Sequence, residues 1–235
     1  MKTVAIVQAR TTSKRLPGKV LSEIEGVPML AHVLRRARAS GVDDVVVAST
    51  TNASDDPLVE IARAEGARWF RGDEHDVLGR YAGAAREAGA DVIVRITADC
   101  PLLDPEVVDR VLGALDPAAD YASNVLERTF PVGLDVEAMR GETLARIAQL
   151  ARSPESREHV TWLLRDESPE LFVRRSVLDD ADNSDLWFAV DTELDLELVR
   201  RLYRELELVE VPRSYRDVVA YARLNGIGVM PRPTE

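Results

Sequence analysis

The first half of the chain alternates short apolar runs with amphipathic stretches, and this alternation limits the possible folds more than any other feature. Residues 4–7, 43–50 and 91–98 carry runs of Val, Ile and Ala, which are typical of strands buried on both faces. In residues 27–41 the apolar side chains instead recur at helical spacing. Strands that alternate with helices through short connections indicate a parallel sheet. We therefore expect a three-layer α/β/α fold with a mostly parallel, Rossmann-like sheet.

The same patterns place the remaining elements. We expect further helices at 55–66, 76–89, 104–115, 141–152, 156–167, 193–206 and 215–226, strands at 67–70, 171–178 and 186–191, and an extended piece at 131–139. Asp55 or Asp56 is expected to cap the first of these helices. No linker, repeat or low-complexity tract interrupts the sequence. We interpret residues 1–235 as one domain with a peripheral excursion at about residues 121–180.

Composition excludes several classes of protein. The formal net charge is -11, which argues against a general nucleic-acid binder. The one cysteine, Cys100, has no partner for an internal disulfide, and we expect it to be a small buried residue. No stretch approaches the length of a membrane span, and the first apolar run is too short for a signal peptide. These features predict a cytoplasmic protein without a membrane partner.

A cluster of positively charged side chains follows the first expected strand. Arg10, Lys14, Arg15 and Lys19 lie within ten residues that also contain a Pro-Gly turn. Backbone amides and cationic side chains in such a loop can wrap the phosphates of a nucleotide. The alternative is a solvated basic loop that pairs with surface acids. Neither the P-loop motif nor the dinucleotide-binding glycine motif occurs, which removes the commonest kinase, GTPase and dehydrogenase readings.

The loop QARTTSKRLPGKVL resembles the signature of the CMP-sugar synthetases that act on acylneuraminate or KDO, in which Ala-Arg leads into Ser-x-Arg-Leu-Pro-Gly-Lys. The whole chain is more similar to the cytidylyltransferase family of spore-coat polysaccharide biosynthesis proteins. Five further blocks occur in the family order: RGDEHDVLGRY, VRITADCPLLDP, FPVGLDVEAM, REHVT and FAVDTELDLELVRRLY. The resemblance covers most of the chain and implies a fold of the nucleotide-diphospho-sugar transferase type.

The resemblance also implies roles for individual residues. Arg10 and Lys19 would contact the triphosphate, Arg15 would assist, and the backbone of Ala9 would approach the nucleotide. Arg71 and Gly72 would lie near the base and ribose, with Asp76 and Arg80 as weaker candidates, and Asp135, Glu137 and His159 would meet the acceptor. For Asp76 a helix cap is the competing role, and for the others it is an ion pair, a solvated strand face or a structural histidine.

Two carboxylates are candidates for a metal site. Asp99 follows an apolar strand beside the expected phosphate site, where a carboxylate is well placed to hold Mg²⁺. By the resemblance, Asp191 would supply a second ligand. Capping of a following helix is the alternative for both, and Asp104 before Pro105 is expected to be a cap only.

The expected function is a Mg²⁺-dependent cytidylyltransferase, with Arg10, Lys19 and Asp99 in the catalytic centre. An oxygen of an acidic sugar, or of a related acid, would attack the α-phosphate of CTP to give a CMP-linked product and pyrophosphate for cell-surface or spore-coat polysaccharide. Two alternatives stay open: a nucleotide-sugar-dependent glycosyltransferase, and a non-catalytic nucleotide-binding protein. A glycosyltransferase would usually show a D-x-D motif where this sequence reads ADCP.

A homodimer is also expected. Trp162, Leu163 and Leu164 lie in an otherwise polar stretch of the excursion. The resemblance implies that this excursion mediates dimerisation, as the corresponding segment does in synthetases of this type. Packing of these three side chains into the core is the alternative.

Overall fold

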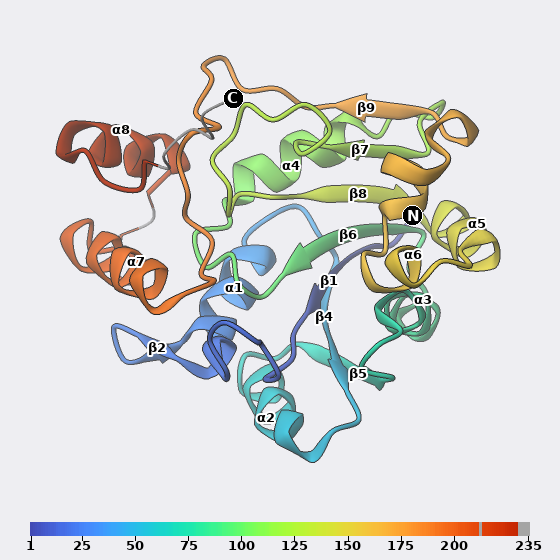
Figure 1. The fold of residues 1–235 in the computed structure, drawn as a ribbon, viewed down its shortest axis with the longest axis horizontal. Helices are drawn as coiled ribbons and strands as arrows, with labels where there is room; N and C mark the ends of the chain where they lie inside the picture. The colour runs from blue at the N-terminus through green and yellow to red at the C-terminus, as the bar shows by residue number, and fades with distance from the viewer. Residues whose placement is uncertain (212, 230–235) are drawn as a thin grey trace.

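A seven-stranded sheet forms the centre of the computed structural model, which describes residues 1–211 and 213–229 (Figure 1). Its strands are β1 (Thr3–Gln8), β4 (Asp44–Thr50), β5 (Arg68–Gly72), β6 (Val92–Thr97), β7 (Tyr121–Ser123), β8 (Glu137–Arg140) and β9 (Arg174–Ser176). The strand order is β5-β4-β1-β6-β8-β7-β9, and β8 alone runs antiparallel to its neighbours. The mostly parallel sheet that the sequence predicts is therefore confirmed.

Helices cover both faces of the sheet. They are α1 (Met29–Arg38), α2 (Asp56–Ala64), α3 (Val77–Ala88), α4 (Pro105–Ala114), α5 (Gly141–Leu150), α6 (Pro154–Glu158), α7 (Glu193–Glu205) and α8 (Tyr215–Asn225). Successive strand residues point to opposite faces, so Ala5 and Val7 join the core under α1, α2, α4, α7 and α8, whereas Val4 and Ile6 join the core under α3 and α5. These are the three layers expected from the sequence. A separate small hairpin pairs β2 (Glu23–Ile24) with β3 (Val27–Pro28).

Short polar side chains fix several helix starts. Asp104 accepts a hydrogen bond from the Glu106 amide at 2.8 Å and Asp76 accepts one from the Gly79 amide at 2.8 Å, so both are N-caps as the sequence predicts. The prediction that Asp55 or Asp56 caps α2 is wrong, because the start of this helix has no side-chain cap hydrogen bond. Asp55 is instead used by the loop after β1, as described below.

Two expected elements differ from the structure. The single helix expected over residues 156–167 does not form. α6 already ends at Glu158, and Val160 has a φ of 39°, which lies in the left-handed region. One π-helical turn (Leu163–Glu167) follows. A β-branched residue at positive φ is strained, and local propensity does not foresee it. The strand expected over residues 186–191 is also wrong, since this segment makes only isolated bridges, such as Val132 with Trp187.

Residues 121–180 build part of the central sheet, because they contribute β7, β8 and β9 together with α5 and α6 (Figure 1). Within this segment Leu163 and Leu164 are buried in the core, so the three-residue apolar patch expected at the surface is reduced to the partly exposed Trp162. Cys100 is buried, as predicted. No helix in the described part of the chain is long and apolar enough to cross a membrane.

Candidate active site

The basic loop leaves the carboxyl end of β1 and is closed by backbone hydrogen bonds. The Gly18 amide donates to the Thr11 carbonyl at 2.8 Å, and Gly18 itself has a φ of 73°, which favours glycine. A 3₁₀ turn (Lys19–Leu21) follows directly. The Pro-Gly turn therefore folds the loop back on itself and brings Lys19 close to the strand ends.

Asp55 anchors this loop to the sheet. Its Oδ1 accepts from the Thr11 amide at 2.8 Å and from the Thr11 hydroxyl at 2.6 Å. Its Oδ2 accepts from the hydroxyl of Thr50 at 2.6 Å and from that of Ser49 at 3.2 Å. Burial alone would raise the pKa of Asp55, but the hydrogen bonds from Thr11 and Thr50 outweigh it and hold the pKa below its usual value. A fully buried carboxylate thus fixes the start of the loop.

Lys19 joins the two candidate metal ligands. Its Nζ lies 2.8 Å from Oδ2 of Asp99, 3.0 Å from Oδ1 of Asp191 and 2.7 Å from the Val190 carbonyl oxygen. These three acceptors match the three donors of an ammonium group. Arg15 contacts the other carboxylate oxygen of Asp191 at 2.8 Å. Segments from three distant parts of the sequence therefore converge on one cluster of two cations and two acids.

The electrostatics of this cluster follow from burial and close pairing. Burial would lower the pKa of Lys19, but the charges and hydrogen bonds of Asp99 and Asp191 raise it above its usual value. Burial would likewise raise the pKa of Asp99, but Lys19 holds it below the usual range. Both groups are consequently charged at neutral pH.

The two carboxylates form a donor set that suits Mg²⁺. This ion is usually bound by one or two carboxylates together with waters and substrate phosphates. Asp99 and Asp191 meet this description because both reach the same point, the Nζ of Lys19. The described residues contain no cluster of three or more His, Cys, Asp or Glu side chains that would make a self-sufficient metal cage. A metal held here would need ligands from a substrate or from water.

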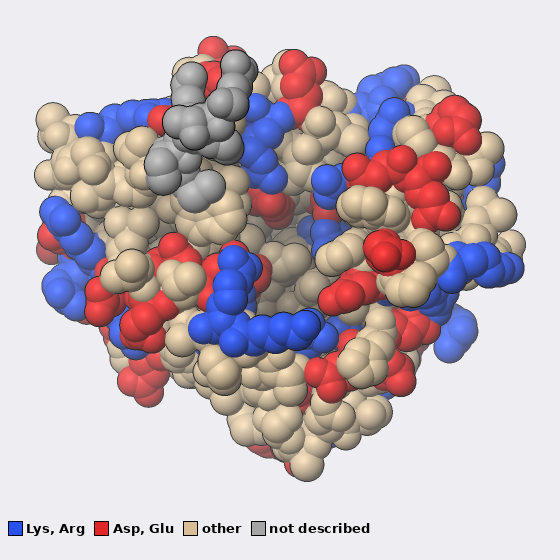
Figure 2. Space-filling model, in the orientation of Figure 1, with Lys and Arg blue, Asp and Glu red and all other residues tan. Residues whose placement is uncertain are grey.

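A cavity of about 420 Å³ opens beside this cluster. Figure 2 shows Lys and Arg side chains gathered around a hollow in this face of the molecule. The charged side chains of the wall are Arg10, Lys14, Arg15, Lys19, Arg80, Arg95, Asp99, Glu158 and Asp191, and the other lining residues include Gln8, Ala9, Ser13, Val77, Thr97 and His159. Cations outnumber carboxylates in the wall, so the site suits an anionic ligand although the whole chain is acidic.

Arg80 is a buried cation in this wall. Only 2% of its surface is exposed, and its Nη1 donates to the carbonyls of Asp73 at 2.6 Å and Glu74 at 2.8 Å. Its Nε has no hydrogen-bond partner, and the described residues give its guanidinium no carboxylate within ion-pair distance. Burial and the nearby charge of Arg10 lower the pKa of Arg80. A buried guanidinium without a counter-ion is costly unless an anion binds there.

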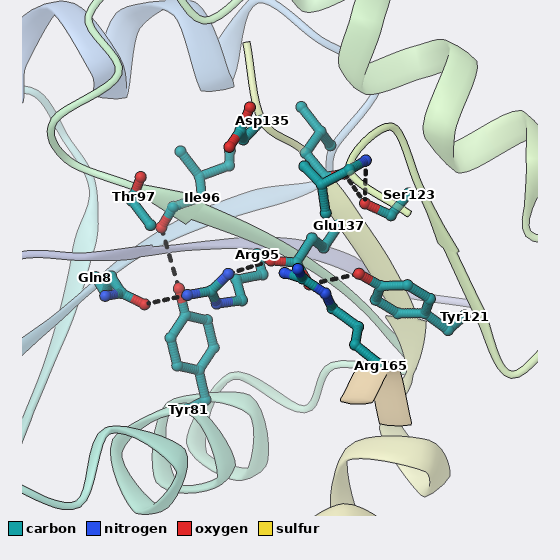
Figure 3. A network of polar contacts seen from close by, with 12 residues as sticks. Gln8, Tyr81, Arg95, Ile96, Thr97, Tyr121, Ser123, Asp135, Glu137 and Arg165 are labelled. Carbon is teal, nitrogen blue, oxygen red and sulfur yellow. Dashed lines mark hydrogen bonds and ion pairs between the residues drawn. The ribbon is translucent and has the colours of Figure 1, made fainter. Parts of the chain in front are cut away.

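Arg95 is the second buried cation, and it lies within a polar network (Figure 3). Its Nη1 forms an ion pair with Glu137 of β8, and its Nη2 donates to the side chain of Gln8 at 3.2 Å. The hydroxyl of Tyr121 donates to the other oxygen of Glu137 at 2.5 Å. Burial would raise the pKa of Glu137, but Arg95 keeps it below the usual value. Glu137 is 3% exposed and is not part of the cavity wall.

The other predicted residues fall into two groups. Ala9 and His159 line the cavity, together with Arg10, Arg15, Lys19, Asp99 and Asp191. Arg71, Gly72 and Asp135 do not. Arg71 donates to the carbonyls of Thr50 and Asn52 at 2.7 Å each and pairs with Asp56 at 2.6 Å, and Asp135 pairs with Arg128 at 2.6 Å.

Gly72 lies instead against the stem of Arg80. A Cβ on Gly72 would stand 2.9 Å from Cγ of Arg80 and 3.3 Å from a ring carbon of Phe70. The absence of a side chain at this position lets Arg80 pass beside β5 towards the cavity. Gly72 thus affects the cavity wall indirectly, by leaving space for the side chain of Arg80.

Sequence reasoning gave no role to Asp55 beyond a helix cap, and none to Arg95. One signal was available for Arg95: a charged residue within the apolar run VIVRIT must be buried with a partner or must face a cavity. No comparable signal existed for Asp55, because its hydrogen-bond donors come from residues 11, 49 and 50.

Comparisons with known proteins decide the family. The model of the family described as "Cytidylyltransferase" matches residues 4–210. The chain belongs to the cytidylyltransferase family. The spore coat polysaccharide biosynthesis protein SpsF from Bacillus subtilis is 32% identical over 217 residues, which cover 85% of each chain. The resemblance seen in the sequence is thus confirmed.

Two solved cytidylyltransferase structures are similar in fold. The first, from Leptospira borgpetersenii serovar Hardjo-bovis, has a TM-score of 0.90 and 29% sequence identity, and the match covers 100% of this chain and 99% of that chain. The second is a CMP:2-keto-3-deoxy-manno-octonic acid synthetase in complex with CTP, with a TM-score of 0.69 and 25% identity. That match covers 87% of this chain and 99% of the other. These neighbours share the mostly parallel α/β architecture.

Proposed function

We propose that this cytidylyltransferase couples CTP to an oxygen of an acidic sugar, or of a related acid, and releases pyrophosphate. The acceptor oxygen forms a bond to the α-phosphorus, the bond from that phosphorus to the bridging oxygen of the β-phosphate breaks, and the acceptor proton passes to solvent or to a base. The convergence of Lys19, Asp99 and Asp191 beside a cationic cavity is the observation that carries this proposal. The CTP complex of the structural neighbour supports the choice of nucleotide.

The cationic side chains would hold the triphosphate. Among the described residues Arg10 has only long contacts to acids, 3.9 Å to Glu74 and 4.0 Å to Glu158, so its guanidinium is available to a ligand. Arg15 and Lys19 lie on the same loop and would share the charge of the leaving pyrophosphate. Phosphoryl transfer depends mainly on positioning and on electrostatic stabilisation, which fixed cations supply.

Asp99 and Asp191 would hold Mg²⁺. A bound Mg²⁺ would neutralise charge on the phosphates and orient them for in-line attack. Without the ion, the same carboxylates keep Lys19 charged and in place between them. The two acids therefore organise the cationic end of the cavity in either case.

His159 would contact the acceptor. It directly follows α6 as its C-cap residue and lines the cavity, and its ring lies 6.0 Å from the ring of Trp162. The next residue, Val160, is fully buried at a strained φ of 39°. Strain of this kind persists where the surrounding structure enforces it, often at functional sites. The buried Val160 would thus fix the orientation of His159 towards the acceptor.

A homodimer is proposed as well. The edge strand β9 is flanked by the partly exposed apolar side chains Leu171, Val173 and Leu178. Edge strands and neighbouring apolar side chains are suited to association with another chain. The molar mass in solution, measured by light scattering, tests this proposal: a mass of twice 26.0 kDa is expected, and a monomer at all concentrations would contradict it.

The experiment that tests the function is a screen of four nucleoside triphosphates against a panel of sugar acids with Mg²⁺, followed by pyrophosphate release. We expect release only when CTP and one class of acid are both present. An Asp99→Asn preparation, purified in the same way, reports contaminating activity. In a parallel assay with nucleotide sugars as donors, release of CMP or of a nucleoside diphosphate together with a glycosylated acceptor would indicate glycosyl transfer. Tight CTP binding without pyrophosphate from any acceptor would indicate a non-catalytic nucleotide-binding protein.

A further inference from the structure

Arg95 occupies an unusual place for a charged side chain. It lies on β6, between the apolar residues Val94 and Ile96, and its neighbours in the sheet are β1 and β8. Arg95 and Thr97 point to the same face of β6, and Asp99 follows in the turn after the strand; all three line the cavity.

The guanidinium of Arg95 has donors that the protein does not use. Nη1 contacts Glu137 and Nη2 contacts Gln8, but each of these nitrogens carries a second hydrogen. Nε is buried and has no hydrogen-bond partner among the described residues. The side chain is 14% exposed, and it forms part of the cavity wall. Arg95 therefore presents a fixed cation with spare N–H groups to whatever fills the cavity.

The charge around Arg95 is not balanced by Glu137 alone. The guanidinium of Arg165 lies close enough to act on both Glu137 and Tyr121, and Figure 3 shows it beside them. In the part of the chain that the structure describes, the only other carboxylate near Arg165 is that of Asp166, at 3.9 Å. One buried carboxylate is thus shared by two arginines, which leaves room for a further anion next to Arg95.

Arg95 lies on a different element from the residues of the proposed triphosphate site. Arg10, Arg15 and Lys19 all belong to the loop after β1, whereas the ion-pair partner of Arg95 belongs to β8. Glu137 also interacts with Thr161, two residues after His159 of the cavity wall. Arg95 therefore contacts β1 through Gln8 and, through Glu137, is linked to the segment that carries His159, where the acceptor is proposed to bind.

We propose that Arg95 binds the carboxylate of the acidic acceptor, and that Glu137 is a positioning residue that holds Arg95 towards it. Glu137 was predicted to contact the acceptor, but its burial outside the cavity wall assigns it this indirect role. The ion pair fixes the guanidinium plane, and a carboxylate accepts two parallel N–H groups from such a plane. This inference rests on the proposed function, because it names the group by which that reaction's acceptor is recognised.

The test uses the full chain, CTP, Mg²⁺ and two probe acceptors, 2-keto-3-deoxy-manno-octonic acid and N-acetylneuraminic acid, each also as its methyl ester. Arg95→Lys keeps the charge that Glu137 needs but loses the planar fork. We expect it to raise the KM for the acid about tenfold or more and to change the KM for CTP less than twofold. The methyl ester, which lacks the carboxylate, should be used equally poorly by the wild type and by the variant.

Further variants separate recognition from folding. In the double variant Arg95→Gln with Glu137→Gln a neutral pair replaces the ion pair, and it should show the same selective loss. Glu137→Gln alone should raise the acceptor KM by a smaller factor without changing the KM for CTP. Arg110→Lys is the matched control, since Arg110 is paired with Asp179 at 3.3 Å and lies outside the cavity wall. Circular dichroism and thermal unfolding check that each variant is folded.

The outcomes distinguish the two proposals. If the wild type releases pyrophosphate and Arg95→Lys raises the KM for CTP as much as that for the acid, the assignment of Arg95 is overturned while the function stands. An equal effect of Arg95→Lys on acid and ester overturns it too. If the wild type releases no pyrophosphate with either acid, the proposed acceptor class is wrong and the role of Arg95 falls with it.

Discussion

The Nζ of Lys19 lies 2.8 Å from Oδ2 of Asp99, although the two residues are far apart in the sequence. The same nitrogen lies 3.0 Å from Asp191, so one side chain of the basic loop holds both acids that follow apolar segments. Each residue alone could be a cap or a surface ion pair. Their meeting at a single atom, beside a cavity with an excess of cations, is the observation that supports the proposed nucleotide site.

Asp99→Asn is expected to lower kcat by about 100-fold or more, because a neutral amide neither binds Mg²⁺ well nor balances Lys19. The fold should persist, since an amide of the same shape can still accept a hydrogen bond from Lys19. Pyrophosphate release measures the rate, and circular dichroism measures the fold. Asp217→Asn is the control, because Asp217 lies in the first turn of α8, outside the cavity wall. A rate near that of the wild type would refute the catalytic assignment of Asp99.

Asp55→Asn should weaken CTP binding and destabilise the fold. An amide cannot accept all the hydrogen bonds that Thr11, Ser49 and Thr50 donate, so we expect a rise of about tenfold in the KM for CTP and a loss of about 1–3 kcal/mol in the free energy of unfolding at pH 7. Asp56→Asn is the matched control, because this neighbouring side chain is exposed and lies outside the cavity wall.

The stability difference between the wild type and Asp55→Asn should depend on pH. The pKa of Asp55 in the folded state lies below its usual value, so the ionised carboxylate stabilises the fold. This contribution is complete above the unfolded pKa of about 4 and is lost as the pH falls through the folded pKa. Urea unfolding should therefore show a large difference in the free energy of unfolding between the wild type and Asp55→Asn at pH 7, and a smaller difference at pH 3. A difference that is the same at both pH values would contradict the prediction.

The parallel half of the sheet could be predicted because its signals are local. Apolar runs such as Val4–Val7 and helical spacing such as that of residues 27–41 specify the elements, and short connections specify their order. The loops after β1 and β6 could be brought together for the same reason, since neighbouring parallel strands end at the same edge. Asp99 was identified from its place after an apolar strand, and Lys19 from the charge of the loop together with the family resemblance.

The rest depends on contacts between segments that no local pattern connects. β8 inserts between β6 and β7 in the antiparallel sense, and this pairing places Glu137 opposite Arg95. The interruption at Val160 is enforced by burial of its side chain against the propensity of the surrounding helix-forming residues. Asp55 lies where a helix cap is expected and is recruited by Thr11 instead. In both cases the sequence pattern favours a local structure, a continuous helix or a helix cap, and tertiary contacts impose a different one.

Gly72→Ala is expected to weaken CTP binding through Arg80. The added Cβ would stand 2.9 Å from Cγ of Arg80, and this atom near the backbone of α3 cannot move without displacing the guanidinium from the cavity wall. We expect a rise of about tenfold in the KM for CTP, and a loss of about 1–3 kcal/mol in the free energy of unfolding from overpacking. Gly113→Ala is the matched control: apart from the adjoining residues and the backbone of α4 itself, no described atom lies within 4 Å of its added Cβ. It should leave the KM unchanged while stabilising α4 by about 0.5–1 kcal/mol.

Arg80→Met separates the two effects of Gly72→Ala, because it removes a buried cation that has no carboxylate partner among the described residues. It should raise the KM for CTP at least as much as Gly72→Ala does, with a thermal midpoint equal to or above that of the wild type. If Gly72→Ala lowers stability but leaves the KM for CTP unchanged, Arg80 does not contact the nucleotide, and the glycine serves packing alone.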